Sequence, residues 1–117
     1  MFNQEVILAQ SKTYDSFYLY DESQIIESIG RLKRDFEDVG FLYSIKTNAY
    51  PAVVKCVLSQ GLGVDAASAA EVMLGVQNGV SKDRIQYSAP GKTKKDIEDT
   101  IGVSTIIADS IGELKLI

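Results

Sequence analysis

The chain has 117 residues, of which 45% are apolar and 24% charged, the balance of a folded globular domain. The 16 acidic residues outnumber the 12 basic ones, giving a net charge of −4 without a basic stripe, which argues against a nucleic-acid partner; no apolar run reaches the ~20 residues of a membrane helix. The absence of histidine and the single cysteine argue against a metal site, and a lone cysteine fits a reducing, cytoplasmic location.

The first predicted elements are a short strand and an amphipathic helix. The aromatic and aliphatic run SFYLYD, residues 16–21, predicts a strand. Apolar residues then recur at helical spacing between residues 22 and 39, which predicts one helix with a single buried stripe. Asp21 is suited to cap the start of this helix, and Gly40 to end it in a left-handed conformation.

Four further strands follow, and a helix separates each from the next. The runs FLYSIK, LGVDAA, RIQYSA and STIIAD begin near residues 41, 62, 85 and 104, roughly 20 residues apart. Such intervals hold one helix and short turns, the pattern of right-handed βαβ crossovers. The sequence therefore predicts an α/β fold in which parallel strands alternate with helices.

Punctuation residues mark the helices between these strands. Pro51 suits a first helical position, and Gly61 closes that helix. The next helix ends near Gly79, and a short, strongly charged one covers residues 92–102. Two S-x-x-E boxes predict helix starts: Ser68 with Glu71 begins the helix that ends near Gly79, and Ser110 with Glu113 begins the last helix.

The stretch FLYSIKTN places a lysine at the end of a strand that otherwise reads as buried. Alternation puts Leu42, Ser44 and Lys46 on one face of that strand. In a closed parallel barrel, reactive groups gather at the carboxyl ends of the strands, where Lys46 would lie. A partly desolvated amine loses its proton more readily and can then attack an aldehyde to form a Schiff base. The residue pattern alone favours the simpler interpretation, a solvated lysine at a strand end.

Four segments in order resemble the pyridoxal-phosphate decarboxylases of the ornithine and diaminopimelate type. They are FLYSIKTNAYPAVVK, GLGVDAASAAEV, RIQYSAPGKTKKDI and IIADSIGELKLI, and the likeness runs from Phe17 to Ile117. The resemblance implies the N-terminal half of a (β/α)8 TIM-type barrel, built like that of alanine racemase and joined in the family to a separate β-domain. It divides the chain into an N-terminal segment with a leading strand, residues 1–21, and a partial barrel of four strands, residues 22–117.

The same resemblance implies that Lys46 carries pyridoxal 5'-phosphate through a Schiff base. It places Asp65 near the cofactor lysine, although an aspartate there can also cap a strand-to-helix turn. Glu71 matches a family glutamate near the cofactor, yet its capping box already gives it a structural role. The implied catalytic residues are therefore Lys46 and Asp65, with Glu71 as a further cofactor-binding residue.

Other polar features have structural interpretations. The residues that match the family's DS…EL stretch, Asp109, Ser110 and Glu113, read as mainly structural. The segment PGKTKK, residues 90–95, lacks the spacing of a nucleotide-binding loop and reads as a solvated loop leading into a charged helix. Cys56 reads as a small packing residue, since nothing nearby would activate its thiol.

The resemblance implies an enzyme that decarboxylates an amino acid and works as a homodimer. The family's glycine-rich phosphate-binding segment and the acidic partner of its pyridine nitrogen lie beyond these residues, so we expect the 117 residues alone to be inactive. Two alternatives stay open. One is a catalytically silent homologue that binds and regulates another protein. The other is a racemase or cofactor carrier of the same barrel type, because KTNAYP also resembles the alanine racemase motif.

We also expect the chain to be part of a longer polypeptide or to pair with a second copy. Half a barrel leaves two unpaired strand edges. The runs FLYSI, LGVDAA and STIIA further predict an apolar sheet face that helices on one side cannot cover.

Overall fold

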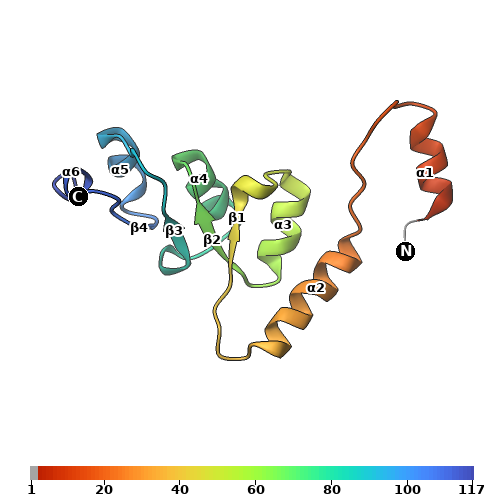
Figure 1. The fold of residues 1–117 in the computed structure, drawn as a ribbon, viewed down its shortest axis with the longest axis horizontal. Helices are drawn as coiled ribbons and strands as arrows, with labels where there is room; N and C mark the ends of the chain where they lie inside the picture. Colours follow the sequence, from red (N-terminus) through yellow and green to blue (C-terminus); the bar gives the residue numbers. More distant parts are fainter. Residues whose placement is uncertain (1–2) are drawn as a thin grey trace.

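Strands and helices alternate along most of the chain in the computed structural model, which describes residues 3–117 (Figure 1). The strands are β1 (Leu42–Ser44), β2 (Gly63–Ala66), β3 (Ile85–Tyr87) and β4 (Thr105–Ile106). The α-helices are α1 (Gln4–Ser11), α2 (Glu22–Asp35), α3 (Pro51–Ser59), α4 (Ala69–Gln77), α5 (Lys94–Thr100) and α6 (Ile111–Leu114). Two 3-10 turns adjoin strands: η1 (Ile45–Thr47) follows β1, and η2 (Lys82–Arg84) precedes β3.

The four strands form one sheet in the order β1-β2-β3-β4, and every neighbouring pair is parallel. In register, Asp65 lies between Ser44 and Gln86, and Tyr87 lies opposite Ile106. Parallel neighbours need a crossover connection, and α3, α4 and α5 supply the three that this order requires. The predicted alternation of parallel strands and helices is confirmed.

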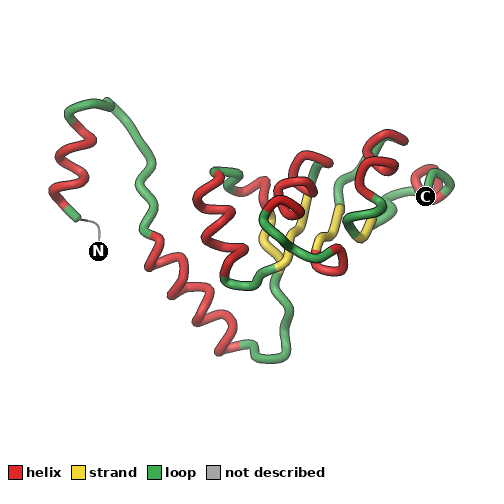
Figure 2. Tube along the Cα trace, turned by 180° about the vertical axis from the view of Figure 1, so that it is seen from behind, coloured by secondary structure: helices red, strands yellow, loops and turns green. Residues whose placement is uncertain are grey.

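The hydrophobic core lies between the sheet and its crossover helices. Figures 1 and 2 show α4 behind the strands in the first view and in front of them in the second. Val54 and Leu58 from α3 and Val72 from α4 pack in one cluster with the sheet. The sheet's buried contributions to that cluster are Val64, Ala66, Ile85 and Tyr87. These residues alternate along β2 and β3, so one face of each strand points to the helices.

The opposite face of the sheet is called the open face here. Alternation and register place on it Leu42, Ser44, Gly63, Asp65, Gln86 and Thr105. None of them belongs to the buried core clusters. The expected apolar open face is therefore wrong, because the large apolar residues of the strands, Leu42 excepted, turn toward the helices. Among the described strands, β1 and β4 remain the unpaired edges.

Local signals fix most helix boundaries as predicted. The Asp21 carboxylate accepts from the Ser23 and Gln24 N–H groups and caps α2. Pro51 is the first residue of α3. Gly61 and Gly79 follow α3 and α4 with φ of 79° and 78°, the left-handed conformation that a side chain would disfavour.

One predicted strand and one predicted helix end are wrong. Residues 16–21 form no strand, because no described segment pairs with them, and a strand is held by its partner's hydrogen bonds. Helix α2 ends at Asp35 rather than at 39, and Gly40 does not adopt a left-handed conformation. Phe36 instead leaves the helix and packs edge-on against Phe41, with 6.3 Å between the ring centroids.

Helix α1 stands apart from the remaining elements at the N-terminal end (Figure 1). None of its residues is buried. Within residues 3–117, no helix combines the length and the apolar character needed to cross a membrane.

Gly63 tests the tight β1–β2–β3 packing. A Cβ at this position would lie 2.5 Å from the Arg84 carbonyl oxygen and would also meet the Leu42 side chain. Because backbone must move to relieve this clash, we expect Gly63→Ala to lower the free energy of unfolding by about 1–3 kcal/mol in urea denaturation.

Gly40→Ala is the matched control, since its Cβ would meet nothing within 4 Å. We expect it to change stability by less than about 0.5 kcal/mol. Equal stability of the two variants would contradict the described strand packing.

Candidate functional site

Lys46 lies in η1, directly after β1 at the carboxyl edge of the sheet. The prediction that Lys46 is the last residue of the strand is wrong, because β1 ends at Ser44. The chain turns there as the Asn48 N–H donates to the Ile45 carbonyl at 3.0 Å and the Thr47 hydroxyl donates to the Ser44 carbonyl at 2.7 Å. The turn packs against β2, so Lys46 stays beside the strand that carries Asp65.

The turn separates the two side chains at its start. Ile45 is fully buried in the core, whereas Lys46 is exposed. No hydrogen bond or ion pair joins the Lys46 amine to any residue between 3 and 117. The amine is therefore free of a competing charge partner.

Asp65 occupies the open face of β2, one strand away from Lys46. It is half-buried, and the Ser88 hydroxyl donates to its Oδ1 atom. Asp65 does not cap α4, whose N-cap is Ser68. Opposite Asp65 in register, the Ser44 hydroxyl oxygen is buried and has no hydrogen-bond partner among the described residues.

Glu71 braces the junction between β2 and α4. The Ser68 hydroxyl accepts from the Glu71 N–H at 3.2 Å, as the predicted box requires. The Glu71 carboxylate, however, accepts from the Ala67 N–H at 2.8 Å, one residue before the cap. Glu71 thus has a structural contact through Oε2, and its other oxygen has no hydrogen bond within the described chain.

The junction between β4 and α6 repeats this arrangement. Ser110 caps α6 by accepting from the Glu113 N–H at 3.1 Å, and the Glu113 carboxylate accepts from the Asp109 N–H at 3.0 Å. The structural interpretation of Asp109, Ser110 and Glu113 fits these contacts. Glu113 differs from Glu71 in also binding a lysine.

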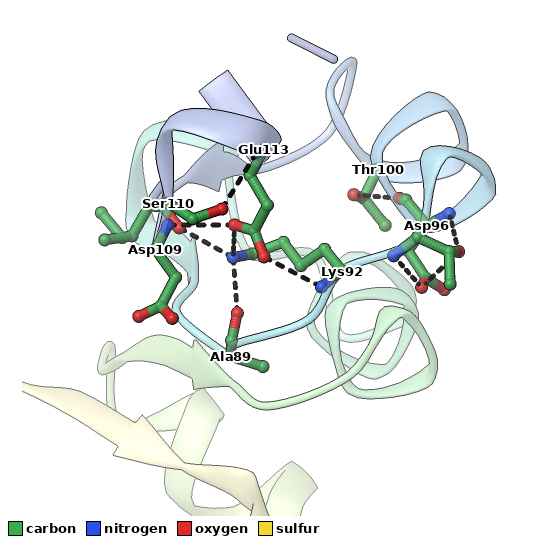
Figure 3. A network of polar contacts seen from close by, with 9 residues as sticks. Ala89, Lys92, Asp96, Thr100, Asp109, Ser110 and Glu113 are labelled. Carbon is green, nitrogen blue, oxygen red and sulfur yellow. Dashed lines mark hydrogen bonds and ion pairs between the residues drawn. The ribbon is translucent and has the colours of Figure 1, made fainter. Parts of the chain in front are cut away.

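Lys92 is that lysine, and the prediction of a solvated loop at residues 90–95 is wrong for it. Its side chain is fully buried, and its Nζ atom lies 3.0 Å from Glu113 Oε2 (Figure 3). The ammonium also donates to the carbonyls of Ala89 and Ile107, the latter at 2.8 Å, and lies 5.3 Å from the centroid of the Tyr87 ring. These partners compensate for removing the charge from water.

The Lys92–Glu113 pair connects two loops at the carboxyl edge of the sheet. The Lys92 N–H donates to Glu113 Oε1 at 3.0 Å, so backbone and side chain grip the same carboxylate. The hydrogen bond from Asp109 N–H, and then the contact with Lys92, lower the pKa of Glu113 to about 2. No local sequence pattern reveals this pair, because its members are 21 residues apart, one strand–helix unit.

Cys56 is buried in α3, which fits the interpretation of a small packing residue, and it lines a groove beside segment 18–20. Its side chain is buried, and burial raises the pKa of the thiol, with a smaller contribution from the Glu22 charge. A thiol that stays protonated is a poor nucleophile.

Two grooves lie away from Lys46, on either side of the extended segment 18–20. One, of about 560 Å³, lies between this segment and α3, and the other, of about 570 Å³, lies between α2 and β1. Tyr18, Tyr20 and Tyr50 stack along the first groove, with centroids 6.5 and 6.1 Å apart. Neither groove includes Lys46, Asp65 or Glu71.

The fold and the residues at the carboxyl edge of the sheet point to one class of protein. Consecutive parallel strand–helix units with reactive side chains at the carboxyl edge are typical of barrel enzymes. Residues 22–117 match the family model described as pyridoxal-dependent decarboxylase, pyridoxal binding domain. The chain therefore belongs to the pyridoxal-dependent decarboxylases, a family that uses pyridoxal 5'-phosphate, and the resemblance predicted from the sequence is confirmed.

Relatives of known function agree with this family. The chain is 35% identical to L-glutamyl-[BtrI acyl-carrier protein] decarboxylase from Niallia circulans, over 96% of this chain and 27% of that protein. It is also 35% identical to diaminopimelate decarboxylase from Staphylococcus aureus, over 85% of this chain and 25% of that protein. The chain thus spans about a quarter of the length of these relatives.

Solved structures give the same result for the fold. The arginine decarboxylase of Paramecium bursaria Chlorella virus superposes with a TM-score of 0.83 at 27% identity, covering 97% of this chain and 31% of that one. Diaminopimelate decarboxylase from Helicobacter pylori, complexed with L-lysine, gives 0.81 at 26% identity, covering 97% and 29%. These neighbours are TIM-barrel decarboxylases, so the four strand–helix units form part of such a barrel, as predicted.

The lowered pKa of Glu113 predicts a pH-dependent contribution to stability. A carboxylate with a folded pKa of about 2 and an unfolded value near 4.5 stabilises the fold fully above pH 4.5, and this stabilisation is lost as pH falls from 4.5 toward 2. We expect Glu113→Gln to lower the urea midpoint at pH 7, because it leaves the Lys92 ammonium buried without a counter-charge.

The difference between this variant and the unaltered protein should shrink below pH 4.5. Asp99→Asn is the control, since it breaks only the exposed Lys95–Asp99 pair on α5. Such a pair is worth about 0.5 kcal/mol or less. A Glu113→Gln effect as small as that of the control at pH 7 would show that the buried pair does not stabilise the fold.

Proposed function

We propose that this chain forms part of a pyridoxal-phosphate-dependent enzyme that decarboxylates an amino acid, with Lys46 as the residue that holds the cofactor. The observation that carries the proposal is the position of Lys46: an exposed amine without a bonding partner, in the turn after β1, within a region that matches the pyridoxal-binding domain. Asp65 and Glu71 are the proposed companions of Lys46 at the cofactor.

The residues present fit this cofactor chemically. A lysine can bond an aldehyde only through an unprotonated, accessible amine, which an ion pair would hold in its charged form. Lys46 has no such pair within the described residues. The buried Ser44 hydroxyl supports the same site, because a buried polar oxygen without a partner is costly unless a bound group or water supplies one.

Each residue has a distinct task in the proposal. Pyridoxal phosphate, when bound, supplies a ring that withdraws the electrons left behind when carbon dioxide departs. Lys46 holds the aldehyde carbon and can afterwards carry a proton at Nζ. Asp65 keeps one carboxylate oxygen, Oδ2, free of hydrogen bonds from the described chain, so it can accept a hydrogen bond from the bound cofactor.

The proposed substrate class and the proposed assembly are based on the family. Relatives are named as decarboxylases of diaminopimelate, ornithine and a carrier-bound glutamyl group. An amino acid is therefore the proposed substrate class, and a homodimer is the proposed assembly.

Borohydride reduction of the intact protein with pyridoxal 5'-phosphate tests the central residue. We expect peptide mapping to place the reduced cofactor on Lys46, because reduction fixes the lysine–aldehyde bond permanently. We expect Lys46→Ala to lose this label and to lower the rate of carbon dioxide release by at least about 1,000-fold.

Lys55→Ala is the control, because Lys55 is an exposed lysine of α3 close in sequence. It should keep both label and rate. Reduced cofactor on any other lysine would overturn the assignment. Loss of the amino acid's optical rotation without release of carbon dioxide would favour the racemase alternative.

A further inference from the structure

We propose that Ser88 is a positioning residue that holds the Asp65 carboxylate in place for the cofactor site. This inference rests on the proposed function, since Asp65 has its cofactor role only there. Ser88 did not stand out in the sequence, and its hydroxyl is the group that contacts the Asp65 side chain.

The sheet places Ser88 next to Asp65. Gln86 lies opposite Asp65 in register, and Ser88, two residues further on, points to the same open face. The Ser88 N–H donates to the Ala66 carbonyl at 3.0 Å, which extends the β2–β3 ladder by one step past the strand. From this backbone position the Ser88 hydroxyl donates to Asp65 Oδ1.

The buried Lys92–Glu113 pair fixes Ser88 from the other side. Lys92 Nζ donates to the carbonyl of Ala89, the residue after Ser88 (Figure 3). Lys92 is itself fully buried and bound to Glu113 and to the Ile107 carbonyl. The backbone at Ser88 is therefore held on both sides: its N–H is bonded to β2, and the next carbonyl, that of Ala89, is bonded to Lys92 at the β4–α6 junction.

This arrangement aims Asp65 rather than stabilising the fold. Ser88 is exposed, and its hydroxyl removes no apolar surface from water, so its contact adds little to folding. A carboxylate with one oxygen held by a donor has a fixed rotamer, which leaves Oδ2 with a defined direction. A group that must meet a bound cofactor benefits from that fixed direction.

The test measures pyridoxal 5'-phosphate binding by the absorbance of the bound cofactor, in the intact protein. We expect Ser88→Ala to raise the dissociation constant roughly 5- to 20-fold while the urea midpoint of the cofactor-free protein stays unchanged. Ser88→Thr keeps the hydroxyl and should restore binding to within about 3-fold. Ser59→Ala, which removes a hydroxyl bonded to the Cys56 carbonyl on α3, should leave binding unaffected.

A double-mutant cycle separates action through Asp65 from any other effect. In an Asp65→Ala background, Ser88→Ala should change the dissociation constant by less than about 2-fold. An equal loss in both backgrounds, or unchanged cofactor binding in Ser88→Ala, would overturn the inference. A loss of urea stability in Ser88→Ala matching the loss of binding would also overturn it, as a structural role. Failure of the proposed function is distinguished separately, because it would appear as borohydride labelling away from Lys46.

Discussion

The parallel register of the four strands is the constraint on which the other features depend. It brings together residues separated by one strand–helix unit. Asp65 meets Ser88 across 23 residues, and Lys92 meets Glu113 across 21. At the opposite edge, the Arg84 guanidinium reaches the Gly61 carbonyl, again across 23 residues. Each contact joins neighbouring units, so the polar groups at the carboxyl edge form a chain of pairwise contacts that no single unit could make alone.

The same register places the core residues and the candidate site residues on opposite faces of the sheet. Alternation sends Val64, Ala66 and Ile85 to the helices and Ser44, Asp65 and Gln86 to the open face. Core residues can therefore be as large and apolar as packing requires without entering the candidate site. Asp65 and Glu71 each keep one carboxylate oxygen that no described residue binds.

Most of the fold could be predicted because its signals are local. Pro51, Gly61 and Gly79 act within a few residues of themselves, and the spacing of apolar runs needs only the chain's own periodicity. The predictions that failed depend on distant partners. The segment at residues 16–21 lacks a partner strand, and the ending of α2 follows the contact between Phe36 and Phe41. The burial of Lys92 depends on Glu113, which lies a whole unit away.

The candidate site likewise combines features that local sequence signals predict with features that depend on distant contacts. Lys46 could be selected from its place after an apolar strand, but only the structure shows that a 3-10 turn intervenes and leaves its amine exposed. The two junction glutamates, Glu71 and Glu113, share one local capping motif but differ in their further contacts. Both carboxylates accept a hydrogen bond from the backbone N–H of the residue before their serine cap. Both oxygens of Glu113 accept hydrogen bonds from the protein, whereas only one oxygen of Glu71 does. No described lysine binds Glu71, so its second oxygen remains unused at the edge that also carries Lys46 and Asp65. At the β4 junction the protein therefore binds both oxygens of the glutamate. At the β2 junction one oxygen of Glu71 stays available to accept a hydrogen bond from a bound group.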